Sequence, residues 1–467
     1  MTWEPNLEGA TGPIYERIAN AMVADIHNGT LQPGDRLPGH RELAAKLGIT
    51  VSTVSRAFRE VIQQNLIDAG TRRGTHVRAD IGVATSNKPG GLREGASDEG
   101  RPVDLRGHRA PLATWAAALR CAMSDCAQDE EFGASLDYVY GGGHLRHREA
   151  GAAWFGITSG SAPEPDRVFI CNGAQHALFC ALLALCDHGD AVATERLTYT
   201  SFKAATPLLG LRLAPIDIDE HGLLPDSFEA ACTAQRIKAL VCVPNLQNPT
   251  TATLPEERRH AIVEIARRHN VSIIEDDVYR GLIDTKLPPL VSLAPERVIR
   301  LTGLSKTLGP GLRIGYLDVP ASMTGKIAAA LHGTSWMASS LPADVATKMI
   351  CNGTAGRILH ENRAELAQRN AILGQILGRQ KIHTAPYAPH AWLELPEPWT
   401  KDEFTRWSRG NGILVLPSDA FAVGRENADH AVRLSVAAAV DQDALANAAR
   451  KIANALIDHT PFVEIMA

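Results

Sequence analysis

The C-terminal part of the chain alternates short apolar runs with longer helical stretches, and this rhythm limits the fold more than any other feature of the sequence. The runs include "AVAT", "ALVCVP", "VSIIED" and "VIRLTG", while a stretch such as "PEERRHAIVEIARRHN" has helical spacing. Unbroken apolar runs indicate strands that are buried on both faces, as in a mostly parallel sheet covered by helices. Residues 102–467 are therefore predicted to form an α/β domain.

A second domain is expected because 467 residues exceed what one ordinary hydrophobic core holds. Residues 80–101, "DIGVATSNKPGGLREGASDEGR", are small, polar and glycine-rich and have no apolar period. This composition predicts a flexible linker. Residues 1–79 precede the linker and are predicted to be a separate domain.

Residues 1–79 have the pattern of three helices followed by a hairpin. Apolar residues at helical spacing predict a helix over residues 14–26, and a turn-rich break separates it from a second helix over 41–47. "LGITVSTVSRAFREVIQQNL" predicts a tight turn, an N-cap at Thr50 or Ser52 and a third helix. "LIDAGTRRGTHVRA" predicts two short strands joined by a basic loop. The order of these elements predicts a winged helix-turn-helix.

The charge of this region points to an anionic partner. The whole chain has a net charge of -5, which argues against nucleic acid as a partner for the chain as a whole. Residues 35–78, however, hold eight Lys and Arg against four Asp and Glu. A solvated helical hairpin would show the same helical period, so the charge and the wing carry the prediction of nucleic-acid binding.

The segments "GTLQPGDRLP", "HRELAAKLGIT", "STVSRAF" and "RRGTHV" make residues 1–79 resemble the GntR family of winged-helix DNA-binding domains. The resemblance implies binding of double-stranded operator DNA by the third helix, the helix before it and the wing. Val51 stands where many relatives carry Arg, which leaves the operator sequence open. The residues expected to contact DNA are Arg36, Arg41, Thr50, Ser52, Thr53, Ser55, Arg56, Arg72 and Arg73.

Several polar residues of the larger domain follow predicted strands. Lys306 follows "VIRLTG" and precedes a Gly/Pro-rich bend, Asp276 and Tyr279 end "SIIEDDVY", and Asn248 ends "VPNLQNPTT". A lone lysine of this kind is usually a solvated surface amine. In an open α/β sheet, however, the carboxyl ends of the strands form the ligand crevice, so these groups are expected to converge.

The chemistry of these side chains suits pyridoxal 5'-phosphate. Lys306 would supply the amine of the imine, and Asp276 would keep the ring nitrogen protonated. Tyr279 and Asn248 would hydrogen-bond to the ring oxygen. "CNGAQHALFC" opens a predicted helix whose N-terminus would bind the phosphate. Gly173, Ala174, Gln175 and Arg313 are expected at the phosphate, and Ser305 is expected to bind the cofactor as well.

At these residues the chain resembles the fold-type I aminotransferases over 102–467. "GLSKTLGPGLRIGYL", "PNLQNPTTATL" and "IIEDDVY" are similar to that family's Schiff-base, Asn-Pro and Asp-x-x-Tyr segments. The same resemblance implies a role for one residue in each of three further segments, "YGGGHLRHREAGAAWF", "ATERLTYTSF" and "HAVRLSVAA". Tyr140 would reach the phosphate of the neighbouring subunit, Tyr199 would stack on the cofactor ring, and Arg433 would bind the carboxylate of an effector. A surface salt bridge is the alternative role for Arg433.

Two residues depart from the aminotransferase pattern. Gly303 replaces a common phosphate-binding Ser three residues before Lys306, which puts one phosphate hydrogen bond in doubt. Thr251 stands where Gly normally follows Asn-Pro-Thr, and it is expected to narrow the pocket or to alter a turn.

The two domains together resemble the MocR subfamily of GntR-type transcriptional regulators. The resemblance implies a homodimer that binds operator DNA and holds pyridoxal 5'-phosphate in its aminotransferase-like domain. A small amino compound would be sensed by aldimine exchange at Lys306, with little or no physiological turnover. Two alternatives stay open: a catalytically active aminotransferase that carries a DNA-binding domain, since the same residues suffice for proton transfer, and a regulator whose effector is pyridoxal phosphate itself.

The cysteines and the apolar runs predict no metal site and no membrane span. The eight cysteines lie apart without the close pairs of zinc ligands, which predicts buried free thiols. The chain has neither a signal-peptide pattern nor an apolar run long enough to cross a membrane, so a cytoplasmic location is expected.

Overall fold

The computed structural model describes residues 3–5, 7, 13–28, 30–31, 34–63, 66–70, 74–77, 102–107, 115–424 and 429–458. The chain divides into two compact units, Met1–Ser97 and Asp98–Ala467. The predicted linker at 80–101 lies outside the described residues, as do Arg72 and Arg73 of the predicted wing.

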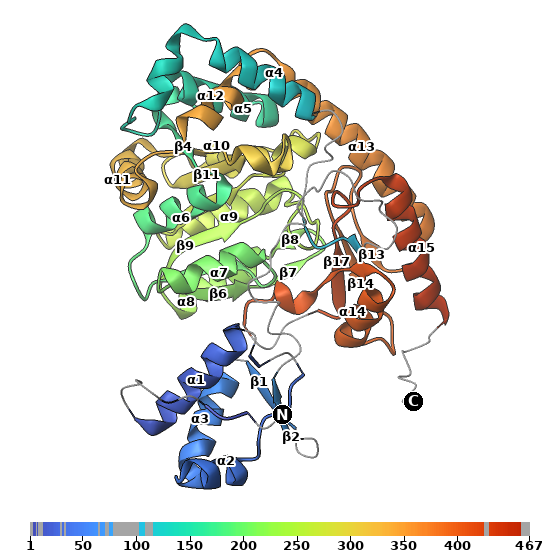
Figure 1. The fold of residues 1–467 in the computed structure, drawn as a ribbon. Coiled ribbons are helices and arrows are strands. Elements are labelled where there is room, and N and C mark those ends of the chain that lie inside the picture. The colour runs from blue at the N-terminus through green and yellow to red at the C-terminus, as the bar shows by residue number, and fades with distance from the viewer. Residues whose placement is uncertain are drawn as a thin grey trace. The chain divides into compact units, whose positions relative to one another are not determined.

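The N-terminal unit is a winged helix-turn-helix, as predicted (Figure 1). Its elements are α1 (Ile14–Asn28), α2 (His40–Leu47), α3 (Val51–Gln63) and the antiparallel pair β1 (Ile67–Gly70) and β2 (Gly74–Val77). Gly48 ends α2 with φ 64°, a left-handed conformation that suits glycine at a tight turn. Thr50 is the N-cap of α3, because its Oγ1 accepts a hydrogen bond of 3.3 Å from the backbone N–H of Thr53.

The core of this unit forms on one face of α3, as the helical period predicts. Val54, Ala57, Phe58 and Val61 are buried, and Ile62 is partly buried. They pack in one cluster with apolar residues of α1, α2 and the hairpin. The opposite face of α3 is left for polar side chains.

The second unit is built on a sheet that has seven strands within the described residues. Its order is β4-β12-β11-β10-β9-β5-β6, and the strands run parallel except β12, which is antiparallel to both its neighbours. The bounds are β4 (Val168–Cys171), β5 (Ala191–Glu195), β6 (Arg212–Ile216), β9 (Ile237–Cys242), β10 (Ser272–Asp276), β11 (Val298–Gly303) and β12 (Gly315–Asp318).

Helices bury both faces of this sheet. Ile274 of β10 packs in a cluster with α6 (Ala174–Leu185) and α11 (Thr324–Ser335). Its neighbour Ile273 packs in a second cluster with α8 (Pro225–Ala234) and α9 (Glu256–Arg268). Successive side chains of a strand point to opposite faces, so a strand covered on both sides is apolar throughout. The predicted α/β architecture is confirmed.

The remaining helices of this part are α4 (Trp115–Ala127), α5 (Leu145–Ser159), α7 (Thr200–Leu208), α10 (Leu290–Leu293) and α12 (Ser340–Cys351). A short strand pair, β7 (Ile218–Asp219) and β8 (Gly222–Leu223), precedes α8. No helix among the described residues is long and apolar enough to cross a bilayer.

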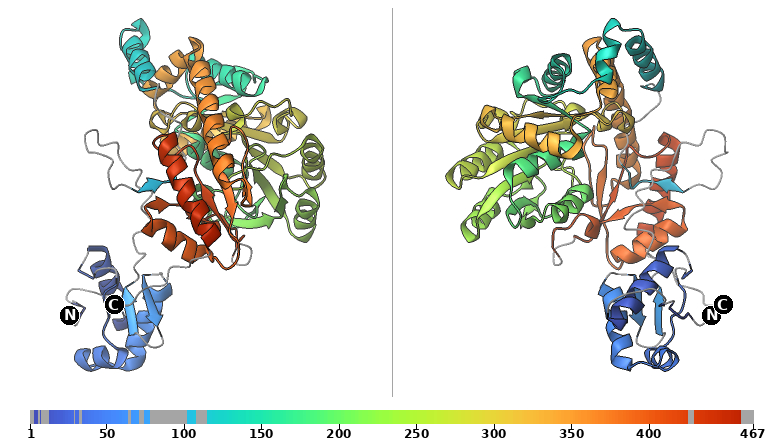
Figure 2. Two further views of the ribbon diagram at one scale, coloured as in Figure 1. Left: turned by 90° about the vertical axis from the view of Figure 1, so that its right-hand side faces the viewer. Right: turned by 60° about the vertical axis from the view of Figure 1, so that its left-hand side comes forward.

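A smaller antiparallel sheet follows toward the C-terminus, in the order β13-β14-β17-β16. The bounds are β13 (Ile382–His383), β14 (Ala391–Glu394), β16 (Leu416–Pro417) and β17 (Ala431–Leu434), and β15 (Ile413–Leu414) pairs with β3 (Val103–Asp104). Its helices are α13 (Thr354–Leu377), α14 (Lys401–Gly410) and α15 (Gln442–Asp458). Figure 2 shows α13, in orange, lying beside α15, in red.

Candidate functional site

The predicted chemical groups meet at the carboxyl edge of the seven-stranded sheet. Asp276 is the last residue of β10, and Lys306 lies three residues after the end of β11 in a short 3-10 turn. Gly173 lies two residues after the end of β4. Because these three strands run in the same direction, all three residues lie at one edge of the sheet.

Asp276 is a buried carboxyl that faces the α6 side of the sheet, as Ile274 does two residues earlier. Tyr199 hydrogen-bonds to it, and the backbone N–H of Val278 donates to its Oδ1 at 3.3 Å. Burial raises the pKa of Asp276 to about 6, although the Tyr199 hydrogen bond and the charge of Lys306 lower it. A cationic ring nitrogen would give this carboxylate the partner that favours its ionised form.

The side-chain amine of Lys306 has an unusually low pKa. Burial, aided by the nearby charge of Arg433 and opposed by that of Asp276, lowers the pKa of Lys306 to about 8. A lysine of ordinary pKa is almost entirely protonated at neutral pH, whereas Lys306 keeps a usable neutral fraction. This property suits a nucleophile that forms an imine.

We expect the rate at which pyridoxal phosphate attaches to Lys306 in the apoprotein to rise with pH up to about 8 and then to level off. The neutral amine is the reactive form, and below its pKa this fraction falls about tenfold for each pH unit. Absorbance after rapid mixing measures the rate. A rate that keeps rising through pH 10 would contradict a lowered pKa at Lys306.

Arg433 lies in the same site and is not a surface residue. It is 5% exposed, its Nη1 donates to Asn248 Oδ1 at 2.9 Å, and its Nη2 donates to the carbonyl oxygen of Arg106. Among the described residues, its Nε has no hydrogen-bond partner, and the side chain forms no ion pair. Burial lowers the pKa of Arg433 to about 10. A buried guanidinium of this kind fits an anionic group of a ligand, and the surface salt bridge is not what the structure shows.

Tyr279 and Asn248 are joined to Arg433 in one chain of contacts. The Nδ2 of Asn248 donates to the Tyr279 hydroxyl at 3.4 Å, while its Oδ1 accepts from Arg433. Burial raises the pKa of the Tyr279 hydroxyl above its ordinary value. Tyr279 therefore keeps its proton and can donate it to a ring oxygen.

The start of α6 forms a cradle for an anion. Gly173 has φ 86°, and a Cβ there would lie 2.7 Å from Nη2 of Arg313. A Cβ on Gly315 would lie 2.6 Å from the carbonyl carbon of Gly173. Arg313 Nη1 also donates to Ser305 Oγ at 3.3 Å. A guanidinium against the N-terminus of a helix of 12 residues fits a phosphate group.

Gly303, which replaces the serine of the aminotransferase pattern, packs closely against the start of α6 in this cradle. A Cβ on Gly303 would lie 3.1 Å from the Cβ of Ala174, so a serine at 303 would crowd the start of α6. Gln175 uses its side chain elsewhere, because its Nε2 donates to the carbonyl oxygen of Ser201 at 3.0 Å. Only its backbone N–H is left to face a phosphate.

Tyr140 stands apart from the other predicted cofactor ligands. It is 67% exposed, and its ring lies 6.2 Å from that of the exposed Trp336. Its loop runs from the 3-10 segment Glu130–Leu136 to the start of α5. The structure of one chain therefore does not bring Tyr140 to the site, and its role at the phosphate of a neighbouring subunit stays a prediction.

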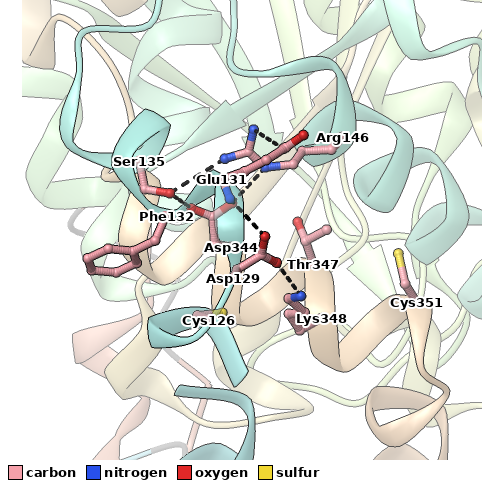
Figure 3. Close-up of a pocket in the computed structure, with 10 residues that line it drawn as sticks. All are labelled: Cys126, Asp129, Glu131, Phe132, Ser135, Arg146, Asp344, Thr347, Lys348 and Cys351. Atoms are coloured by element: carbon pink, nitrogen blue, oxygen red, sulfur yellow. Dashed lines mark hydrogen bonds and ion pairs between the residues drawn. The ribbon is translucent and has the colours of Figure 1, made fainter. Parts of the chain in front are cut away.

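A charged cluster beside a cavity of about 180 Å³ holds the loop of Tyr140 in place (Figure 3). Asp344 of α12 accepts hydrogen bonds from Arg146 Nε at 2.9 Å and from Ser135, and His147 Nε2 lies 2.6 Å from its Oδ1. Burial would raise the pKa of Asp344, but these hydrogen bonds lower it well below its ordinary value. The cluster ties both ends of the loop to α12.

His390 is a site residue that the sequence did not single out. It is fully buried, its ring lies 5.7 Å from that of Tyr279, and its Nε2 is 2.9 Å from the carbonyl oxygen of Gln247. Burial and the nearby charge of Arg433 lower the pKa of His390 to about 3, so the ring is neutral. A lone histidine in "APHAW" carries no motif that would have indicated this position.

Thr251, which stands where the aminotransferase pattern has glycine, adopts the left-handed conformation that glycine favours. Its φ is 67°, which is strained for a β-branched residue. We expect Thr251→Gly to raise the free energy of unfolding by about 1 kcal/mol. Asn270→Gly is the matched control, because Asn270 has φ 51° but asparagine tolerates this region. Urea unfolding measures both, and an equal gain in the control would contradict strain specific to Thr251.

Seven of the nine residues expected to bind DNA lie within the described part of the N-terminal unit. Arg36 and Arg41 are exposed, and Arg36 forms an isolated bridge with His76 of the hairpin. Along the start of α3, Thr50, Ser52 and Arg56 are exposed, while Thr53 and Ser55 are partly buried.

Several of these side chains already have partners within the unit, and Thr50 Oγ1 lies 2.8 Å from both Ser52 Oγ and Thr53 Oγ1. Arg56 donates to the Tyr15 hydroxyl at 3.0 Å and lies 3.7 Å above its ring. Ser55 Oγ lies 3.0 Å from Nδ1 of His40. Arg56 would have to leave Tyr15 to reach a base edge.

Comparison with known families and proteins divides the chain in the same way. The family described as bacterial regulatory proteins, gntR family, matches residues 14–77, and aminotransferase class I and II matches residues 99–452. The uncharacterized HTH-type transcriptional regulator YdeF of Bacillus subtilis is 30% identical over 94% of this chain and 93% of its own length.

Two further relatives represent regulators and enzymes. The vitamin B6 salvage pathway transcriptional repressor PtsJ of Salmonella typhimurium is 27% identical, over 94% of this chain and 96% of its own length. The crystal structure of an archaeal alanine:glyoxylate aminotransferase has a TM-score of 0.71 at 22% identity, covering 77% of this chain and 92% of that one. At that identity the likeness shows the shared fold alone.

Proposed function

We propose that this chain, which belongs to the aminotransferase class I and II family, senses an amino compound at Lys306. It combines the aminotransferase-like domain with a gntR-family domain, as MocR-type DNA-binding regulators do. The observation that carries the proposal is the presence of both family domains in one chain, matched along nearly all its length by relatives named as regulators. A regulator of this kind acts on chromosomal DNA in the cytoplasm.

The residues of the site fit pyridoxal 5'-phosphate. Bound there, the cofactor would supply an aldehyde that captures amines and a ring that withdraws electrons. The cradle formed by Gly173 and Arg313 would hold the phosphate, and the Asp276 carboxylate would pair with the ring nitrogen. Tyr279 would donate its proton to the ring oxygen, with Asn248 beside it. Tyr199, whose hydroxyl contacts Asp276, would cover the ring.

Arg433 indicates the class of effector. The amine of the effector would replace the amine of Lys306, while its carboxylate or sulfonate would bind the Arg433 guanidinium. The unpartnered Nε and the burial of Arg433 support an anionic group at this point. Differential affinity of the effector for two arrangements of the domain would then alter DNA binding.

A homodimer is part of the proposal. Leu136, Tyr138, Tyr140 and Trp336 are exposed, and the rings of Tyr138 and Trp336 lie 5.7 Å apart. Exposed apolar groups gathered in this way are typical of protein interfaces. Tyr140, which no contact brings to its own site, would bind the phosphate of the partner. Light scattering that returned the mass of one chain would contradict this part of the proposal.

The decisive experiment measures cofactor absorbance, DNA affinity and product together. DNA fragments selected from the genome by the loaded protein supply the operator, and amino acids, GABA, taurine and small diamines supply the amines. We expect one amine to shift the absorbance and the operator affinity without sustained oxo-acid formation. Operator affinity and bending that stay the same with every amine that shifts the absorbance would refute sensing, and steady turnover with an oxo acid would indicate an aminotransferase.

A second candidate is a regulator whose effector is the cofactor itself. The similarity to PtsJ, a repressor named for vitamin B6 salvage, favours it. In that case the cofactor-free protein would lose specific DNA binding, whereas added amines would leave the affinity of the loaded protein unchanged.

A further inference from the structure

Two thiols and an imidazole gather behind the start of α6. Cys171 ends β4, and His176 and Cys180 lie one turn apart on α6. Their sulfur and ring nitrogen atoms all lie within 4.8 Å of one another, and both cysteines are fully buried. Both cysteines are buried free thiols, as the sequence predicts, whereas Cys121 and Cys351 are exposed, which the prediction had wrong.

The hydrogen bonds of His176 fix where its proton lies. The backbone N–H of Asn172 donates to Nδ1 at 3.2 Å, so the proton of the neutral ring is on Nε2. The hydroxyl of Thr334 donates to the carbonyl oxygen of Ala330 at 2.8 Å, so its oxygen can accept from Nε2, which is 2.8 Å away. The Nε2–H therefore points toward Thr334 and the sulfur of Cys180, at 3.3 Å.

This proton position argues against a metal ion. A metal bound between the two thiols would need the lone pair of Nε2, which carries the proton here. An N–H directed at a sulfur instead stabilises a thiolate. The cluster is built to hold one sulfur as an anion.

The two thiols are unequal, as an oxidisable pair requires. The hydrogen bond from the Cys171 thiol, followed by that from His176, lowers the pKa of Cys180 even though burial raises it. The same sulfur contact, with burial, raises the pKa of Cys171. One sulfur is therefore the better nucleophile and the other stays a thiol.

We propose that Cys180 and Cys171 form an oxidisable thiol pair that reacts with hydrogen peroxide, with Cys180 as the attacking thiolate and Cys171 as the resolving thiol. The Cys180 sulfur attacks one peroxide oxygen and the O–O bond breaks. Cys180 becomes a sulfenic acid, and the other oxygen takes a proton and leaves as water. The Cys171 thiol then attacks the sulfenic sulfur, an S–S bond forms, the S–O bond breaks and a second water leaves. The two thiols supply the two electrons that reduce the peroxide.

The thiol cluster lies close to solvent and next to the phosphate cradle. Thr334 is exposed and His176 is partly buried, and both contact Cys180, so the cluster lies close to solvent on this side. Cys171 lies two residues before Gly173 of the phosphate cradle, so the bond would join the end of β4 to α6 next to the cradle. The thiol chemistry itself does not depend on the proposed cofactor or on DNA binding.

The test treats the full-length protein with hydrogen peroxide, blocks remaining thiols and maps the peptides by mass spectrometry. We expect a linked peptide between Cys171 and Cys180 that forms before the exposed Cys121 and Cys351 are oxidised. Cys171→Ser should stop the reaction at a sulfenic acid on Cys180 that dimedone traps. His176→Ala should slow the oxidation of Cys180 about tenfold, since it loses the stabilising N–H. His188→Ala, at an exposed histidine, is the matched control.

Two results would overturn the proposal. Cys180 could stay reduced while Cys121 and Cys351 are oxidised, or zinc added alone could bind one per chain and protect both Cys171 and Cys180 from alkylation. The second result would make the cluster a metal site. All these readouts report the chemical state of the cysteines. A negative result would therefore overturn the thiol pair and leave the proposed regulatory function unaffected.

Discussion

Lys306→Ala should abolish covalent attachment of pyridoxal phosphate. After borohydride reduction, intact mass should show one cofactor on each wild-type chain and none on the variant. The reason is that Lys306 is the amine at the carboxyl edge of the sheet with a pKa lowered to about 8, next to the cradle and Asp276. The same variant should lose every absorbance change on addition of amines, because no imine remains to be exchanged.

Lys326→Ala is the control for unspecific modification. Lys326 lies on α11 and is exposed, so its loss should leave one cofactor per chain. An unchanged adduct in Lys306→Ala, mapped to another amine, would remove Lys306 from its assigned role and with it the proposed mode of sensing.

Asp276→Asn should weaken cofactor binding about a hundredfold. An amide cannot pair with a protonated ring nitrogen, and losing one partner of a buried ion pair costs about 3 kcal/mol. Equilibrium dialysis of the apoprotein with pyridoxal phosphate measures the affinity. The ring nitrogen should also lose its proton more easily, which changes the absorbance of the bound cofactor.

Stability separates this effect from unfolding. Burial raises the pKa of Asp276 to about 6, above the unfolded value near 4, so ionisation at neutral pH costs folding free energy. An amide avoids this cost, and the Asp276→Asn apoprotein should melt no lower than wild type. Glu275→Gln is the matched control, because Glu275 points the other way and accepts from the N–H groups of Leu290 and Val291. Loss of cofactor affinity in Glu275→Gln as well would show that the effect is structural.

Much of the fold could be predicted because helical and strand periods are local. The run "VSIIED" indicated β10, and the apolar spacing of Val54, Ala57 and Phe58 indicated the buried face of α3. Parallel strands share a carboxyl edge, so the meeting of Asp276 and Lys306 there also followed from the order of the elements. Their assigned roles in binding the cofactor stay predictions.

The pattern of residues alone determined which segments form helices or strands and which chemical groups stand at the strand ends. The tertiary structure decided what depends on neighbours distant in sequence. It placed Arg433 against Asn248, turned Arg56 onto Tyr15, left Tyr140 exposed, and brought Cys171 to Cys180 and His176. The physical reason is that burial, hydrogen-bond partners and pKa values are set by packing between elements, which no local period encodes.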